Sequence, residues 1–162
     1  MRERTGAQAG WPGMDKTNSL PPLARYLGYA GLLPQVLCVG LAAGQSAYAY
    51  TAIAGGFAYA AAIFSFLGGV WWGQGLHAPR KGQFAVAVLP SLIAVALFLP
   101  WTFGWTWPGP QLIILGAFIV LSPLVDRALG TTPRGFLALR WQLSAGLGTL
   151  TIALGFIADS IV

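Results

Sequence analysis

Residues 26–79 read YLGYAGLLPQVLCVGLAAGQSAYAYTAIAGGFAYAAAIFSFLGGVWWGQGLHAP and contain no Asp, Glu, Lys or Arg. The run is 54 residues long and lies between Arg25 and Arg80. A single α-helix of that length would measure about 80 Å, whereas about 20 apolar residues suffice to cross a bilayer. The run must therefore turn back once, and the small and polar residues at 43–46 (AGQS) are its best turn signal.

Two further charge-free runs continue this pattern. Residues 82–125 form a run of 44 that contains WTFGWTWPGP at 101–110, whose two prolines and two glycines cannot continue a helix. Residues 141–158 form a run of 18, which is long enough for one more span. The chain is therefore predicted to contain five transmembrane helices, near 26–43, 50–76, 84–100, 111–126 and 140–158.

The composition agrees with a membrane protein. The 162 residues are 56% hydrophobic and 8% charged, and the mean hydropathy is +0.68. A soluble domain carries about 25% charged residues. These values exclude a soluble enzyme, a disordered chain and a nucleic-acid binder. We expect an all-α integral membrane protein, in which a disordered polar leader at 1–20 precedes a small five-helix bundle at 21–162.

The positions of Lys and Arg predict the orientation. All nine lie in the N-terminal segment, in the loop after the second span or in the loop after the fourth. Because short loops rich in Lys and Arg stay in the cytoplasm, we expect a cytoplasmic N-terminus and a periplasmic C-terminus. The leader contains Glu3 and Asp15, unlike an organellar transit peptide, which favours a multi-pass protein of the bacterial inner membrane.

The second span contains a row of small residues at every fourth position, namely Ala61, Ser65, Gly69 and Gly73. Such a row forms a groove that allows another helix backbone to approach closely. Packing among the five helices is the first interpretation. Docking of a partner protein or of a second copy of the chain is the other.

Few residues offer chemistry. Asp126 is the only acid next to a predicted membrane core, and three interpretations of it stay open. It marks the boundary of the fourth span together with Arg127, it forms an ion pair with Arg134 or Arg140, or it handles protons. We name as candidate functional residues the polar and aromatic groups near this end of the bundle: Trp71, Trp72, Gln74, His77, Asp126 and Arg127.

The remaining inventory argues against catalysis and metal binding. His77 is the single histidine and Cys38 the single cysteine, whereas metal and haem sites usually need several strong ligands. The sequence contains no phosphate-binding loop and no Ser/His/Asp set at plausible spacing. We therefore expect no catalytic residue, no cofactor and no metal.

Three stretches carry a resemblance to a known family: LPPLARYLGYAGLLP at 20–34, Tyr59 followed by IFSFLGGVWWG at 63–73, and Asp126-Arg127. They resemble the domain of unknown function 3429 family, to which the animal transmembrane protein 69 is related. The resemblance covers residues 20–158. It implies a small multi-span protein of bacterial inner membranes or mitochondria, and it brings no established activity.

The leading functional hypothesis is a non-catalytic subunit, assembly factor or stabilising factor of a membrane complex. The alternative is a binder or transporter of a small apolar or aromatic ligand such as a lipid, a quinone or a porphyrin. Kinks at Pro34 and Pro90 and the pair Trp71-Trp72 motivate that alternative. An enzyme based on Asp126 and His77 ranks last. The expected partners are the lipid bilayer and, beyond it, another membrane protein or a second copy; no nucleic acid is expected.

Overall fold

A computed structural model of the chain describes residues 22–77, 80–105, 109–130 and 134–161, and it forms six helices there. They are α1 (Pro22–Ala30), α2 (Leu33–Ala43), α3 (Ala49–His77), α4 (Gln83–Thr102), α5 (Gly109–Leu129) and α6 (Arg134–Ile161). With α1 and α2 counted as one span, five helices are long and apolar enough to cross a membrane. The predicted leader at 1–20 lies outside the described residues.

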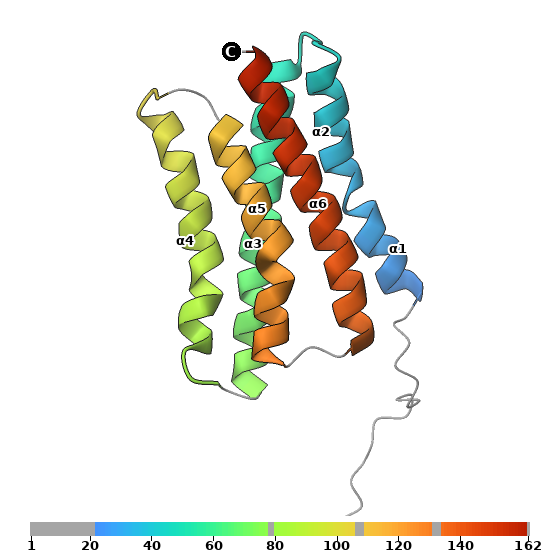
Figure 1. The fold of residues 1–162 in the computed structure, drawn as a ribbon, viewed down its shortest axis with the longest axis vertical. Coiled ribbons are helices and arrows are strands. Elements are labelled where there is room, and N and C mark those ends of the chain that lie inside the picture. Colours follow the sequence, from blue (N-terminus) through green and yellow to red (C-terminus); the bar gives the residue numbers. More distant parts are fainter. Residues whose placement is uncertain (1–21, 78–79, 106–108, 131–133, 162) are drawn as a thin grey trace, which may run out of the picture.

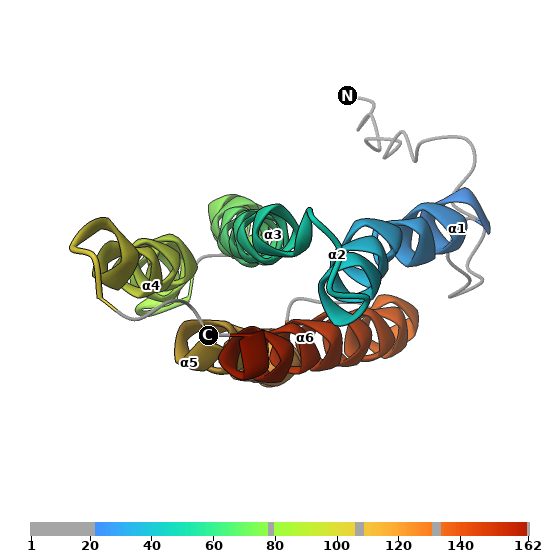
Figure 2. The same cartoon turned by 90° about the horizontal axis from the view of Figure 1, so that it is seen from above.

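The helices form two layers (Figures 1 and 2). One layer contains α4, α3 and α2 side by side, and the other contains α5 and α6. The start of α1, the end of α3 and the end of α5 lie at one end of the bundle, and the C-terminus lies at the opposite end (Figure 1). Arg25, Arg80, Lys81 and Arg127 therefore share one end, which we call the basic end.

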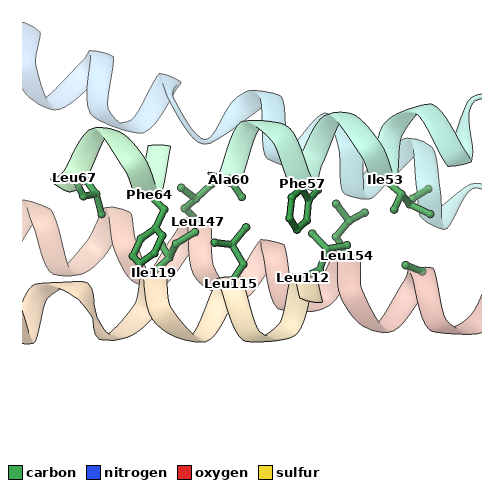
Figure 3. Packing of buried hydrophobic residues seen from close by; sticks show 12 residues of the cluster. Ile53, Phe57, Ala60, Phe64, Leu67, Leu112, Leu115, Ile119, Leu147 and Leu154 are labelled. Carbon is green, nitrogen blue, oxygen red and sulfur yellow. The ribbon is translucent and has the colours of Figure 1, made fainter. Parts of the chain in front are cut away.

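Three helices build the core from buried stripes (Figure 3). Within each stripe the residues are alternately three and four positions apart, which keeps them on one face of a helix. The stripes are Ile53, Phe57, Ala60, Phe64, Leu67 and Trp71 on α3; Leu112, Leu115, Ile119, Ser122 and Asp126 on α5; and Arg140, Ser144, Leu147, Thr151, Leu154 and Ala158 on α6. The stripe on α3 is apolar along its length, the stripes on α5 and α6 include buried hydroxyl groups, and each stripe ends at the basic end in a residue that can form a side-chain hydrogen bond.

The most extensive helix contact joins α5 and α6, which run antiparallel. A Cβ atom added to Gly116 would lie 2.6 Å from the carbonyl oxygen of Gly148, and one added to Gly148 would lie 2.7 Å from the carbonyl oxygen of Gly116. Gly155 repeats this contact one heptad further along, where an added Cβ would lie 2.8 Å from the Gly109 oxygen. Small residues on both helices allow such close backbone approach, which gains packing contacts in lipid.

The first span is broken. Helix α1 ends at Ala30 and α2 begins at Leu33, with Pro34 in its first turn, where the missing N–H leaves no unsatisfied donor. The hydroxyl of Tyr59 on α3 donates a hydrogen bond to the carbonyl of Gly31 at this break. Helix α2 packs on α3 and α6, whereas α1 contains no buried residue and extends away from the bundle (Figure 2).

The other turns lie where the sequence places them, and the helix ends differ in detail. Helix α2 ends at Ala43 beside the predicted turn at 43–46, and α4 ends at Thr102 within the proline-rich stretch. Helix α6 begins at Arg134 rather than at 140, because its first turns carry charged residues that a hydropathy criterion leaves out. Gly130 ends α5 with φ 59°, a left-handed conformation that glycine adopts without a Cβ clash.

Candidate functional site

The polar ends of the three core stripes meet at the basic end of the bundle. Trp71 comes from α3, Asp126 from the last turn of α5 and Arg140 from the second turn of α6. All three are buried, and Asp126 is only 2% exposed. We call these residues the Trp–Asp–Arg triad.

Asp126 joins the other two members of the triad. The indole Nε1 of Trp71 donates a hydrogen bond of 2.7 Å to Oδ1 of Asp126. The guanidinium Nε of Arg140 donates one of 2.7 Å to Oδ2, which makes a buried ion pair. The helix dipole disfavours a carboxylate in the last turn, and burial removes the water that would solvate it. The hydrogen bonds from Trp71 and Arg140 compensate the Asp126 carboxylate for both effects.

This arrangement shows which interpretation of Asp126 applies. The carboxylate is not a solvated charge at the boundary of a span, because it is buried and paired. The ion-pair interpretation holds, and the partner is Arg140. Arg127, its neighbour in sequence, is exposed on the other side of the helix.

One nitrogen of the Arg140 guanidinium has no hydrogen-bond acceptor among the described residues. Arg140 Nη2 is buried, and no acceptor among the described residues lies within hydrogen-bonding distance. An arginine commonly binds a carboxylate with two parallel N–H donors. Here Trp71 occupies the second carboxylate oxygen, so the usual two-point pairing is replaced by a three-residue bridge.

A second polar contact fixes Trp71 from its backbone side. The side-chain Nε2 of Gln83, at the start of α4, donates to the carbonyl of Trp71 at 3.0 Å. The Oε1 of Gln83 accepts a hydrogen bond from the backbone N–H of Arg80 at 3.2 Å. Gln83 is 1% exposed, so it ties the α3–α4 connection to the triad without contact to solvent.

An apolar cavity of about 470 Å³ lies beside the triad. It is lined by α1, the break between α1 and α2, the middle of α3, Ile119 of α5 and the first half of α6, and we call it the α1–α3–α6 cavity. Its walls are almost entirely aliphatic or aromatic; the polar side chains among them are Tyr59, Arg140 and Ser144. Small-molecule sites commonly have this size and this combination of apolar walls with a few polar groups.

The other candidate residues do not join the triad. Trp72 is 45% exposed and its ring packs edge-on against Phe84, with centroids 4.9 Å apart. His77 is exposed and its Nδ1 lies 3.1 Å from the carbonyl of Gly73 in its own helix. Gln74 is half-buried. The candidates therefore separate into a buried pair, Trp71 and Asp126, and groups that lie elsewhere at the basic end.

The small-residue row on α3 faces outward over part of its length. A Cβ atom added to Gly69 or Gly73 would meet nothing within 4 Å, so no described helix packs on the row there. Ala61 and Ser65 line a groove of about 340 Å³ between α3 and α4. The tightest glycine of α3 is instead Gly68, which an added Cβ would drive into the carbonyl of Ala87 on α4.

The candidate cluster drawn from the sequence omits Arg140, which enters there only as a possible ion-pair partner of Asp126. A signal for it exists in the sequence. Continuing the three-and-four spacing of the apolar stripe on α6 towards its start leads from Leu147 to Ser144 and then to Arg140. A charge that falls on the buried face of a helix is a stronger indication of a site than a charge at its boundary.

Among the described residues no group of three or more His, Cys, Asp or Glu side chains could hold a metal ion. No curated protein and no solved structure matches the chain. A family model described as "Protein of unknown function (DUF3429)" matches residues 20–156, which include all three members of the triad and the whole α1–α3–α6 cavity. The chain therefore belongs to the DUF3429 family of membrane-type helical bundles.

Proposed function

We propose that the protein binds a small apolar molecule from the membrane in the α1–α3–α6 cavity, and that it does so without catalysing a reaction. The observation that carries the proposal is the cavity of about 470 Å³, whose apolar walls end at the buried Arg140. A molecule held there would contact residues from four helices, namely α1, α3, α5 and α6. Three residues of α1 line it, Ala24, Leu27 and Gly28, and the first two are exposed, so we expect entry from the surrounding lipid along α1.

The cavity replaces the features on which the ligand hypothesis first rested. Trp71 and Trp72 do not line it, and neither does Pro90. Pro34 does not line the cavity, but it follows the break of the first span, where Gly31 and Leu32 form part of the cavity wall. The break turns α1 away from α3 and leaves the space between them.

We expect a neutral methyl ester of a fatty acid with a diazirine in mid-chain to label the cavity on illumination. Mass spectrometry of the purified protein should find the label on the lining residues of α1, α3 and α6. An excess of the unlabelled ester should suppress it, since one enclosed site saturates. Leu143→Trp, which fills the cavity, should lower this labelling about tenfold.

Leu124→Trp is the matched control, because Leu124 is exposed on α5 and lines none of the described cavities. It should leave the labelling of the cavity unchanged. Labelling that is spread evenly over the outer faces of all helices and does not saturate would contradict the proposal.

A second candidate function is that of a subunit, assembly factor or stabilising factor of a membrane complex. It is favoured by the outward position of the small-residue row, where Gly69 and Gly73 leave open space at the surface. A transmembrane helix of a partner could approach the α3 backbone there.

For this second function we expect Gly69→Leu to abolish recovery of a stoichiometric partner from native membranes in mild detergent, while the protein itself stays inserted. Gly40→Leu is the matched control, because it makes the same change on α2 at a position where an added Cβ would also meet nothing within 4 Å. Equal recovery of the partner with both variants would count against this role.

The orientation proposed for both functions follows from the charges. The described cations Arg25, Arg80, Lys81 and Arg127 lie at the basic end, which we place in the cytoplasm of a bacterial cell. The triad and the cavity mouth beside it then lie nearer to the cytoplasmic surface of the inner membrane.

A further inference from the structure

We infer that the α1–α3–α6 cavity holds one acyl chain lengthwise, with its terminal methyl group in the middle of the bundle and the polar end of the molecule at the basic end. The inference rests on the proposed function and adds the chemical class of the ligand, a membrane lipid bound through one linear chain. It follows from the shape of the cavity, which is long, closed at one end and open towards the other.

The cavity follows the first half of α6. Its lining residues on this helix extend from Phe136 in the first turn to Leu147, which lies 11 positions further along. At a rise of about 1.5 Å per residue this distance is about 16 Å. Carbon–carbon bonds of about 1.5 Å advance an extended hydrocarbon chain by about 1.3 Å each, so about 12 carbons span that length. A linear chain therefore matches the longest dimension of the cavity.

The end of the cavity in the middle of the bundle is closed by contacts between helices. Leu32 packs against α6, because a Cβ atom added to Gly146 would lie 3.0 Å from Cδ1 of Leu32. The hydroxyl of Tyr59 donates a hydrogen bond to the carbonyl of Gly31, which joins α3 to the break of the first span. Leu147, the last lining residue on α6, is buried. A chain that enters the cavity therefore stops at these residues.

The other half of the cavity reaches the surface. Three of its lining residues are exposed, namely Ala24, Leu27 and Phe66. All three lie on the basic-end side of the contact between Tyr59 and Gly31, because α1 begins at that end and α3 finishes there (Figure 1). The polar end of a lipid can therefore stay outside, at the membrane surface, while its chain lies inside.

The polar side chains of the wall do not call for a polar ligand. They are Tyr59, Arg140 and Ser144, and each has a partner inside the protein. Tyr59 is hydrogen-bonded at the break of the first span, and Arg140 is paired with Asp126. The hydroxyl of Ser144 lies 3.3 Å from that of Ser122. The ligand is therefore held by packing against apolar walls, and the length of chain that fits governs its affinity.

Two photoreactive methyl laurates test the orientation of the chain, one with the diazirine next to the ester and one with it next to the terminal methyl group. The protein is kept in digitonin, whose steroid body does not imitate a linear chain. The first probe should label the protein near Ala24 and Phe136, and the second should label it near Leu32 and Leu147. The same distribution of label from both probes would overturn the lengthwise orientation.

The length of the chain is tested with unlabelled methyl esters of unbranched fatty acids, from octanoate to stearate, as competitors of the photoreactive ester. The mole fraction that halves the labelling should fall about tenfold from octanoate to laurate and then stay level, because further carbons protrude from the open end. Equal potency of all esters would overturn the inference, as would a gain that continues to stearate. Menadione, a ring compound without a chain, would overturn it by competing better than methyl laurate.

Leu32 offers a test of the closed end. Leu32→Trp should shorten the chain at which the gain stops by about three carbons, and Leu32→Ala should lengthen it by about two. Leu143→Ala is the matched control, because Leu143 lines the side of the cavity between Phe136 and Leu147. It should change the potency of all esters alike and leave the stopping length where it was. An unchanged stopping length in Leu32→Ala would overturn the inference even if Leu32→Trp fails to fold.

Failure of the inference is distinguishable from failure of the proposed function. Saturable labelling of the cavity that depends neither on chain length nor on the position of the diazirine would overturn the inference and leave the proposed function standing. Absence of saturable labelling with every photoreactive ester would remove the proposed function itself, and the inference with it.

Discussion

Asp126→Ala is expected to lower the free energy of unfolding by about 3–5 kcal/mol, the largest loss that a single substitution in this chain should cause. The change leaves the Arg140 guanidinium buried with no counter-charge and removes the acceptor of the Trp71 indole. The free energy would be measured by titrating the purified protein from mild detergent into a denaturing one and following helix content. A loss below about 1 kcal/mol would show that the triad is open to water.

Two companion variants separate the pair from its surroundings. Arg127→Ala removes the exposed charge next to Asp126 in sequence, and it should change the free energy by less than about 0.5 kcal/mol. Asp126→Leu combined with Arg140→Leu should be much less destabilising than the sum of the two single changes. Replacing both members of a buried ion pair by apolar residues often leaves stability unchanged, whereas removing one member leaves the other buried without a counter-charge.

Gly148→Ala is expected to destabilise the bundle by about 1–3 kcal/mol, although alanine is the better helix former. The added methyl group would lie 2.4 Å from Cγ2 of Val120, 2.7 Å from the carbonyl oxygen of Gly116 and 3.0 Å from the backbone nitrogen of Val120. The last two are backbone atoms, which cannot rotate away, so α5 and α6 must move apart. The same detergent titration measures the loss.

The same substitution at Gly69 should have the opposite sign. Nothing lies within 4 Å of a Cβ atom there, so only the gain in helix propensity remains, about 0.5–1 kcal/mol. Equal effects at the two positions would show that the α5–α6 crossing is looser than described.

The number of spans could be predicted from the sequence because the bilayer imposes a length on each span. The charge-free run at 26–79 is too long for one helix, and its AGQS turn lies next to the observed end of α2. Most charged residues lie where the chain leaves the membrane, and clusters of Gly, Pro and small polar residues lie between the spans, so these features mark the turns.

The contacts between helices could not be predicted in the same way. Regular spacing of small residues singled out the row that includes Gly69, yet the close backbone approaches use Gly68 on α3 and the pair Gly116 and Gly148. Within lipid both faces of a helix are apolar, so hydropathy does not show which face turns inward. The side of a helix that faces a neighbour depends on how well the surfaces of the two helices fit together. The sequence pattern of one helix alone does not contain this information.

Only part of the candidate site could be predicted from the sequence, for a related reason. Asp126 and Trp71 could be named from the sequence as residues near one end of the bundle, and Arg140 could be named as one possible ion-pair partner. That they share one buried bridge depends on the antiparallel register of α5 and α6, which the glycine contacts set. The cavity depends on the break at Gly31 and Leu32, and hydropathy runs smoothly across that break.

The order in which the stripes occur along the chain bears on how the protein is made. In the buried core cluster, the stripe on α3 packs mainly against residues of α5 and α6, which are synthesised last. Asp126 therefore reaches the membrane before Arg140 emerges from the ribosome, and at about 5–20 residues per second the 14 residues between them take about one to three seconds. During that interval the carboxylate has no cation of α6 to pair with, so the insertion machinery must hold the unfinished bundle until the final helix arrives.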